Sequence, residues 1–461
     1  MKKGRHYSEE EIKVITQSVI GKSFNDIINS ELITVEDNKL QKGSLGDIIE
    51  EALFGIEKNT DSEPDFIDAG IELKVTPYRR NKDNTLSAKE RLVLNIIDYD
   101  TEYANEFKSS HFWFKNNKLE ILWYLNEENK EKLDFIITNE ILLDLSKSED
   151  INQIEKDYYF ITNKIKQGKA HELSEADTMY LGACTKGTDS KDLRSQPFSK
   201  IPAMRRAFCF KNSYMTQLVR KYIGNYENIE KLLTNTKLSF DEYITNIIKK
   251  YIGKSQKELM TEFNIDSTAK NLNSIIINRM FGVKSNLSET EEFLKAQIIP
   301  RTIRIEENGN IKESMPFPSF NFCELVNETW NNSTFRTTLE ETKYLFFIFK
   351  KTNNDYIFKG IKLWNMPELV LENEVKEMWT KTVETIKSGN IVKSIDEKGF
   401  RITNFPGMSE NKVCHVRPHA RDSKDTYPLP TKDKLTGLSE YTKQCFWINN
   451  KYLEEILKDF I

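Results

Sequence analysis

Several features are scarce in this sequence, and each absence excludes a class of protein. Its 461 residues include only five cysteines, which are widely spaced and form no Cys-x-x-Cys pair. This excludes a zinc finger or a disulfide scaffold and favours reduced thiols. No apolar run is long enough to cross a bilayer, and no apolar segment follows the basic start to form a secretory signal. We therefore expect a cytoplasmic protein without membrane contact.

Proline and glycine are also few, at 12 and 18 residues, and the net charge is only −4. With 38% hydrophobic and 30% charged residues, the composition is that of an ordinary globular protein. One stretch, 181–222, is strongly cationic and contains Arg206 and Lys211 beside Phe208 and Phe210. Such a stretch indicates binding to a phosphate backbone, and the alternative is a solvated basic face.

The chain contains an internal repeat. Three pairs of segments match in the same order, the first two at an offset of 227: Leu45–Ile56 with Leu272–Val283, Asp65–Lys74 with Glu292–Arg301, and Phe208–Met215 with Phe446–Leu453. Matches in a common order predict two copies of one domain. We place these copies at 1–228 and 238–461.

Apolar spacing predicts the elements of each copy. Helices are expected at 9–19 and 44–53, capped by Ser8 and Ser44, and at 155–168 and 214–222. Strands are expected at 70–75, where Pro77 would end the strand, and at 91–99 and 118–125. This pattern predicts a mixed α+β fold in each copy, with a central mixed sheet flanked by helices.

The first copy carries a group of residues suited to metal-dependent hydrolysis. On the strand at 70–75, alternation places Glu72 and Lys74 on one face. Asp65 joins them if residues 66–70 form a hairpin connection. Two carboxylates and an ammonium suit Mg²⁺-assisted cleavage of phosphodiesters, and Glu50 could supply a third carboxylate. The alternative is an amphipathic strand whose charges are merely solvated.

The second copy serves as an internal control. Ile277 stands at the position of Glu50, Glu292 at Asp65, Ile299 at Glu72 and Arg301 at Lys74. Since isoleucine offers no oxygen to a metal ion, we expect the second copy to keep the fold and lack the chemistry.

These strings resemble a known family. KGSLGDIIEEALFG, PDFIDAGIELKVTP and SHFWFKNNKLEILW are similar to the DNA mismatch-repair nickase MutH. Over the whole chain, further strings such as RAFCFKNSYMT, CHVRPHA and FWINN resemble the MutH-related type II restriction endonucleases that cut at GATC. The resemblance implies a restriction-endonuclease-like fold, Mg²⁺ as cofactor, and double-strand cleavage that leaves four-base 5′ overhangs.

The resemblance also assigns roles by position. It makes Asp65 and Glu72 metal ligands and Lys74 the catalytic lysine. Glu50 matches the helix glutamate of the family, but one extra residue separates it from Asp65, so Glu51 is an alternative. The family's further active-site lysines correspond to Lys42 and Lys115.

For recognition of DNA, Lys186 and Gly187 resemble part of the loop that reads base pairs in the major groove. Cys184 stands where the nickase has an arginine, and Cys209 where it has a tyrosine linked to sensing adenine methylation. In the second copy, the string that contains Arg417 and His419 is closer to the nickase loop, which implies DNA binding by that copy as well.

The leading hypothesis is a type II restriction endonuclease, built as a pseudo-dimer with an active first copy and a second-site effector copy. We expect a monomer in solution that engages two GATC sites, with both strands cut by two chains together on DNA or by sequential nicks. The alternatives are a MutH-type strand-nicking repair endonuclease and a non-catalytic GATC-binding protein.

Overall fold

The computed structural model describes residues 4–29, 44–56, 63–186, 192–224, 226, 229–234, 238–266 and 271–461. The chain divides into two compact units. The first unit comprises residues 1–240 together with 289–297, and the second comprises 241–288 and 298–461. The segment 289–297 therefore belongs to the first unit, although it lies within the second sequence copy.

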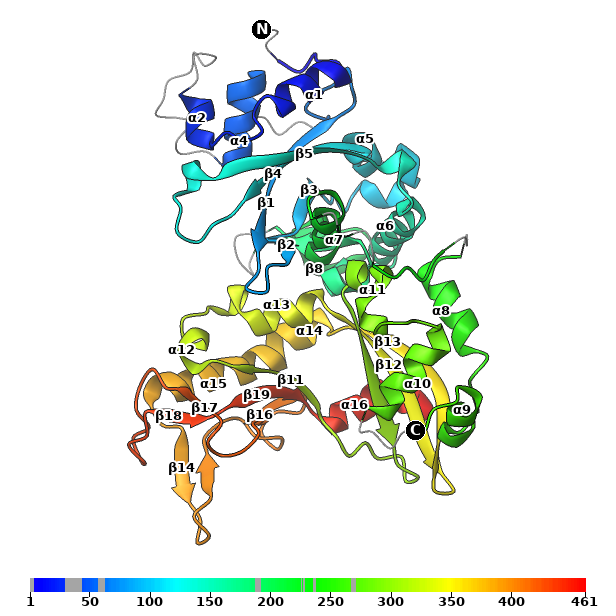
Figure 1. The fold of residues 1–461 in the computed structure, drawn as a ribbon, viewed down its shortest axis with the longest axis vertical. Helices are drawn as coiled ribbons and strands as arrows, with labels where there is room; N and C mark the ends of the chain where they lie inside the picture. The colour runs from blue at the N-terminus through cyan, green and yellow to red at the C-terminus, as the bar shows by residue number, and fades with distance from the viewer. Residues whose placement is uncertain are drawn as a thin grey trace. The chain divides into compact units, whose positions relative to one another are not determined.

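The first unit is a mixture of helices and short sheets (Figure 1). Its helices are α1 (Glu9–Gln17), α2 (Phe24–Ile28), α4 (Leu45–Ile49), α5 (His111–Asn116), α6 (Ile151–Lys166), α7 (Asn212–Tyr222) and α11 (Glu291–Ala296). Its strands are β1 (Glu72–Arg80), β2 (Leu86–Ala88), β3 (Leu92–Ile96), β4 (Lys118–Leu125), β5 (Ile136–Asp144), β6 (Leu181–Thr185), β7 (Leu193–Gln196), β8 (Ser199–Met204) and β9 (Arg206–Phe210).

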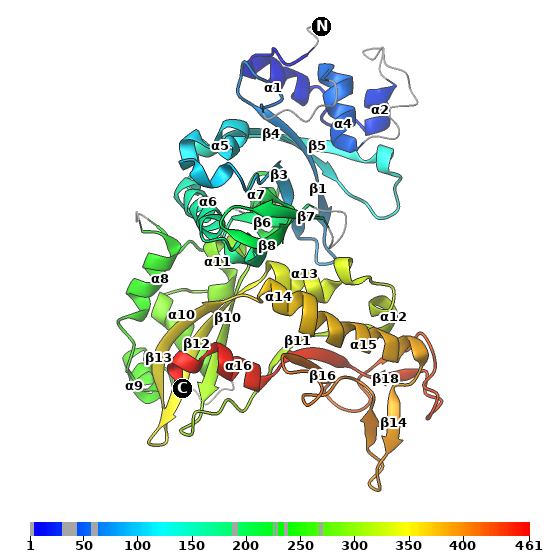
Figure 2. The ribbon, with the colours of Figure 1, turned by 180° about the vertical axis from the view of Figure 1, so that it is seen from behind.

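The second unit is likewise a mixture of helices and short sheets, and Figure 2 shows it from behind. Its helices are α8 (Phe240–Ile248), α9 (Gln256–Glu262), α10 (Leu272–Phe281), α12 (Phe322–Leu325), α13 (Thr334–Glu341), α14 (Glu368–Val370), α15 (Lys376–Ser388) and α16 (Asn450–Ile456). Its strands are β10 (Ile298–Ile305), β11 (Met315–Phe320), β12 (Lys343–Thr352), β13 (Asp355–Trp364), β14 (Val392–Ile395), β15 (Arg401–Thr403), β16 (Cys414–Pro418), β17 (Thr426–Pro428), β18 (Glu440–Thr442) and β19 (Gln444–Ile448).

The sheets of the two units share one topology. In the first unit the order is β2-β1-β4-β5, with β1 parallel to β4 and β4 antiparallel to β5. In the second unit the order is β10-β12-β13, with the same parallel and antiparallel pairs. Each unit also has a three-stranded antiparallel sheet, β3-β9-β6 or β11-β19-β16. This shared topology supports the proposed duplication, and the mixed α+β class is confirmed.

The helices α1, α2 and α4 cover one side of the sheet that contains β1, β4 and β5 (Figures 1 and 2). Between them lies a core that includes Phe24, Ile48, Phe54, Phe66 and Leu73, each at most 1% exposed. A side chain of that size contributes about 1.5–3 kcal/mol when it is fully buried. The helices are thus held against the strand that carries Glu72 and Lys74.

Local sequence signals account for the helix starts. Ser8 and Ser44 cap α1 and α4 as predicted, each in a capping box with an acidic residue three positions later. The prediction that Pro77 ends the strand is wrong, because β1 continues to Arg80. The carbonyl of Pro77 accepts from the Lys89 amide, so its nitrogen faces the same side of the strand. On that side the ladder with β2 runs from Tyr78 onward, so the missing N–H falls at the end of the ladder and not within it.

Within the described ranges, no helix combines the length and apolar character that a membrane span requires.

Candidate active site

The predicted hairpin before β1 is present and brings Asp65 beside Glu72. Phe66 and Ile71 form an antiparallel bridge, and Gly70 takes a positive φ of 63° in the turn between them. The Asp65 amide donates to Glu72 Oε2 at 3.2 Å, and the Leu73 amide donates to Asp65 Oδ2 at 2.9 Å. The Glu72 carboxylate is therefore held by the Asp65 amide, and the Asp65 carboxylate by the amide of the residue that follows Glu72.

Two lysines converge on Glu72. Lys74, two residues along β1, places its Nζ 2.6 Å from Glu72 Oε1. Lys115, in the last turn of α5, places its Nζ 3.6 Å from the same oxygen. The Glu72 side chain is only 4% exposed, so both ammonium groups act on it in a weakly screened environment. Lys115 therefore lies in the same cluster as Asp65, Glu72 and Lys74, the three residues that the strand and hairpin pattern had grouped.

Glu50 interacts electrostatically with this cluster. Burial raises the pKa of Glu50 to about 7, with Asp65 adding to the rise and Lys74 opposing it. The chain changes from α-helix to a π-helical turn at Glu50, and Gly55 ends this turn in the left-handed conformation. A π-turn accommodates one additional residue in a helix, which fits the extra residue found between Glu50 and Asp65.

The pKa values of Asp65 and Lys74 are shifted as well. Burial raises the pKa of Asp65 to about 6, and the nearby Glu72 carboxylate adds to this rise. Burial alone would lower the pKa of the Lys74 ammonium, but its ion pair with Glu72 raises it above its ordinary value. Carboxylates that repel one another in a buried site are stabilised by a divalent cation.

The donor chemistry of the cluster fits Mg²⁺, which binds carboxylate oxygens and keeps several waters. Among the described side chains, no three His, Cys, Asp or Glu residues converge as a preformed metal site. Instead, Lys74 and Lys115 neutralise Glu72 directly. The carboxylates of Asp65 and Glu72 are the groups here that could hold such an ion, and Glu50 interacts electrostatically with Asp65.

Arg5 is a site residue that the sequence interpretation missed. Its guanidinium donates to the carbonyl oxygens of Pro64 at 2.6 Å and of Asp65 at 3.3 Å. These bonds fix the backbone that carries the Asp65 carboxylate. No local pattern indicates such a contact, because 60 positions separate Arg5 from Asp65.

Several predicted DNA-binding residues differ in accessibility. Lys186 follows β6 and is exposed, and its amide donates to the Arg205 carbonyl. Arg206 is 1% exposed and donates to the Ala183 carbonyl, and Lys211 is fully buried and donates to the Thr178 carbonyl. Buried side chains whose donors are engaged by backbone carbonyls do not present charge to a phosphate. This burial argues against DNA contacts by Arg206 and Lys211. The predicted residues Lys42 and Gly187 lie outside the described residues.

In the second sequence copy the equivalent positions, among the described residues, hold no carboxylate cluster, and the one carboxylate among them, Glu292, lies in the first unit. Ile277 is 3% exposed on α10, and Ile299 lies on β10 opposite Tyr344 of β12. Glu292 lies on α11 and accepts from the Leu232 and Leu233 amides, so it helps to anchor that helix.

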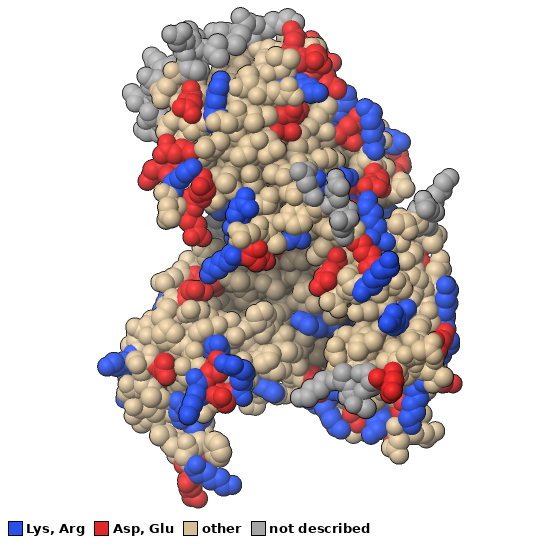
Figure 3. Space-filling view, viewed as in Figure 1, with Lys and Arg blue, Asp and Glu red and all other residues tan. Residues whose placement is uncertain are grey.

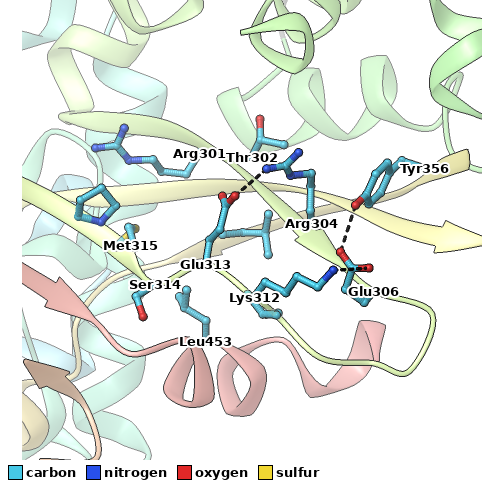
Figure 4. A pocket seen from close by; sticks show the side chains of 13 residues that line it. Arg301, Thr302, Arg304, Glu306, Lys312, Glu313, Ser314, Met315, Tyr356 and Leu453 are labelled. Atoms are coloured by element: carbon cyan, nitrogen blue, oxygen red, sulfur yellow. Dashed lines mark hydrogen bonds and ion pairs between the residues drawn. The ribbon is translucent and has the colours of Figure 1, made fainter. Parts of the chain in front are cut away.

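A cavity of about 320 Å³ in the second unit is lined by Arg301 of β10 and by neighbouring charged side chains (Figure 4). Its other charges are already paired: Arg304 binds Glu313 and Lys312 binds Glu306. The second unit therefore keeps a strand equivalent to β1 and a cation, Arg301, at the position of Lys74. It has isoleucine at the position of Glu72.

Arg417 and His419 are both exposed, at the end of β16. The guanidinium of Arg417 lies over the ring of Trp447, and the His419 ring packs beside the same indole. The structure therefore places both predicted DNA-binding residues on an accessible surface of the second unit.

A family model and a curated relative match this chain. The family model described as the DNA mismatch repair enzyme MutH matches residues 54–157, which include Asp65, Glu72, Lys74 and Lys115. The type II restriction enzyme Sau3AI from Staphylococcus aureus is 36% identical to this chain, and the alignment covers 96% of the chain and 97% of that enzyme.

Proposed function

The chain belongs to the family of MutH-related type II restriction enzymes and is a site-specific deoxyribonuclease, and on this basis we propose that it cuts double-stranded DNA at GATC with Mg²⁺. The resemblance of its motifs to enzymes that cut this sequence supports GATC as the site, with four-base 5′ overhangs. Because such an enzyme acts on DNA inside a cell, we place it in the cytoplasm.

The observation that carries this proposal is the pairing of Asp65 and Glu72 across one hairpin, with Lys74 and Lys115 directed at Glu72. Asp65 and Glu72 would hold Mg²⁺, with Glu50 completing the acidic side of the site. When bound, the ion would supply Lewis-acid neutralisation of the charge that develops on the phosphate and would make a bound water more acidic.

The lysines have complementary roles in this proposal. Lys74, whose Nζ lies 2.6 Å from Glu72 Oε1, would hold the attacking water or a phosphate oxygen by hydrogen bonding. Lys115, whose Nζ lies 3.6 Å from Glu72 Oε1, would contact a neighbouring phosphate oxygen. Arg5 keeps the Asp65 backbone in place throughout.

We propose a different task for the second unit, that of binding a second GATC site and stimulating the first unit. The retained topology together with Ile277 and Ile299 supports a DNA-binding unit without chemistry of its own. A monomer in solution would then engage two sites, and both strands would be cut by two chains on DNA or by sequential nicks.

A repair nickase fits the observations less well. The MutH family model covers only residues 54–157, whereas the similarity to a restriction enzyme extends over 96% of the chain. A non-catalytic GATC-binding protein would not require the buried acidic cluster that the first unit retains.

The direct test is incubation of the purified chain with unmethylated plasmid DNA and Mg²⁺, followed by sequencing of the fragment ends. The proposal requires cuts at GATC with four-base 5′ overhangs, and ends at other sequences would contradict it. A second assay compares plasmids that carry one or two GATC sites. Faster cutting of the two-site plasmid supports the effector role, and equal rates would remove it.

A further inference from the structure

The first unit contains an acidic cavity of about 360 Å³, which we call the glutamate cavity. Its walls come from α1, β4, β5 and the last residue of α7. Among the described side chains of its walls are four glutamates and a single lysine: Glu9, Glu10, Glu120, Glu140 and Lys13. Cavities that hold small ligands in proteins measure about 300–1,000 Å³. The glutamate cavity is therefore large enough for a small ligand, and it lies apart from the carboxylates of the candidate active site.

Strand register places two of these glutamates on one face of the sheet. Glu120 of β4 stands opposite Leu142 of β5, and Glu140 lies two residues from Leu142, so all three share a face. Lys118, two residues from Glu120 on β4, pairs with Glu9 of α1 at 2.9 Å. This face is therefore the one that α1 covers, and the carboxyl groups of Glu120 and Glu140 lie on the side where α1 forms the opposite wall.

The Glu120 carboxyl group is buried but incompletely bonded. The residue is 2% exposed, yet its Oε1 accepts no hydrogen bond from any residue that the structure describes. Burial raises the pKa of Glu120 to about 7, with Glu140 adding to the rise and Thr16 opposing it. A buried oxygen without a donor destabilises a protein, and such groups are typical of sites where stability is given up for function. The Oε1 atom is available to a donor that enters the cavity.

Most of the negative charge of the cavity is not neutralised by the protein. Within the described ranges, three of the four glutamates make no ion pair: Glu10, Glu120 and Glu140. Glu9 is paired with Lys118, and Glu140 accepts from the neutral side-chain amide of Gln17 at 2.9 Å. On the surface drawn in Figure 3, acidic side chains gather around the position that α1 has in Figure 1. The charge of the cavity therefore favours a cationic ligand.

The distribution of the carboxylates favours an elongated cation over a metal ion. In the part of the chain that the structure describes, no three acidic, histidine or cysteine side chains converge closely enough to hold a metal. The glutamates come instead from three different elements around the cavity, and Leu142 and Tyr222 add apolar surface to its walls. An aliphatic polyamine matches this pattern, because its ammonium groups each carry three donors and are separated by apolar methylene groups.

We propose that the glutamate cavity binds an aliphatic polyamine, with one ammonium group held by Glu120 and Glu140 and another by the exposed Glu10. The buried ammonium group donates the hydrogen bond that Glu120 Oε1 lacks. The methylene chain lies against Leu142 and Tyr222. This binding does not depend on the proposed cleavage of GATC, because it uses none of the residues assigned to that reaction.

The experiment is calorimetric titration of the full chain with 1,4-diaminobutane in a metal-free buffer. We expect one diamine to bind per chain. Glu120→Gln and Glu140→Gln should each weaken binding about 10-fold, because each replaces a charge-assisted hydrogen bond by a neutral one. Butylamine, which has a single ammonium group, should bind about 10-fold more weakly than the diamine.

Matched variants separate binding from folding and from general electrostatics. Glu120→Gln keeps the shape of the side chain and removes a buried charge, so it should fold at least as stably as the wild-type chain. Glu128→Gln removes an exposed glutamate of the same unit outside the cavity, and Glu72→Gln removes a carboxylate of the candidate active site. Both should leave the affinity for the diamine unchanged. In thermal unfolding, the diamine should raise the Tm of the wild-type chain more than that of Glu120→Gln.

Three results would overturn the proposal. The first is the absence of diamine binding at millimolar concentration. The second is equal weakening by Glu128→Gln and Glu120→Gln, which would show that the diamine only screens the acidic surface. The third is loss of binding in Glu72→Gln, or displacement of the diamine by an equal concentration of Mg²⁺, which would place the bound cation in a metal site instead.

Discussion

Replacing Lys74 by methionine should destabilise the metal-free protein, because it leaves the Glu72 carboxylate with one cation fewer. The Glu72 side chain is 4% exposed and Lys74 Nζ lies 2.6 Å from it. Removing one partner of a buried ion pair costs about 3–5 kcal/mol. Lys115 remains at 3.6 Å and compensates in part, so we expect a loss of about 2–3 kcal/mol in the free energy of unfolding.

The assay is urea denaturation in EDTA, arranged as a double-mutant cycle with Glu72→Gln. In the double variant Glu72 no longer carries a buried charge that needs Lys74, so part of the stability should return, although Asp65 and Glu50 still lack that ammonium. We expect a coupling energy of about 1–2 kcal/mol between the two sites. The matched control is Lys118 with Glu9, an ion pair of 2.9 Å whose glutamate is half exposed. That pair should couple by less than about 1 kcal/mol. Additive effects at Lys74 and Glu72, or equal coupling in the control, would refute the reasoning.

Two further predictions concern the first unit. Glu120→Gln should raise the free energy of unfolding at pH 8 by about 3 kcal/mol and leave it unchanged at pH 4. Burial, aided by Glu140, raises the pKa of Glu120 to about 7, so the wild-type chain loses stability as the pH rises from about 4.5 to about 7. Equal stabilisation at both pH values in urea titrations would contradict this. Lys295→Met should cost about 3–5 kcal/mol, because it strips Asp150 and Glu291 of an ammonium 2.7 Å from each. A change below about 1 kcal/mol in thermal unfolding would show that this ion-pair network does not anchor α11.

Sequence alone could predict that Asp65, Glu72 and Lys74 lie together, because these residues are close to one another in the chain. Strand alternation and a short hairpin suffice to bring Asp65 to Glu72 and Lys74, and the structure has this hairpin. The choice between Glu50 and Glu51 could not be made, because it depends on where the π-helical turn begins.

Local sequence patterns could not predict contacts between distant positions or the burial of individual charged side chains. Arg5 reaches the Asp65 loop from 60 positions away. Arg206 and Lys211 were interpreted as surface cations from composition, yet backbone carbonyls of the interior bind them both. The aromatic ring under Arg417 comes from another strand, so the spacing of Arg417 in the chain gives no sign of it.

The central claim is that chemistry resides in the first unit at Lys74 and its neighbouring carboxylates, and that the second unit has none. The most direct measurement compares Mg²⁺-dependent cutting of GATC plasmid DNA by Lys74→Met and by Arg301→Met, the same change at the equivalent position of the second unit. We predict that Lys74→Met abolishes cutting while Arg301→Met still cuts. Cutting by Lys74→Met, or loss of cutting in folded Arg301→Met, would contradict the account.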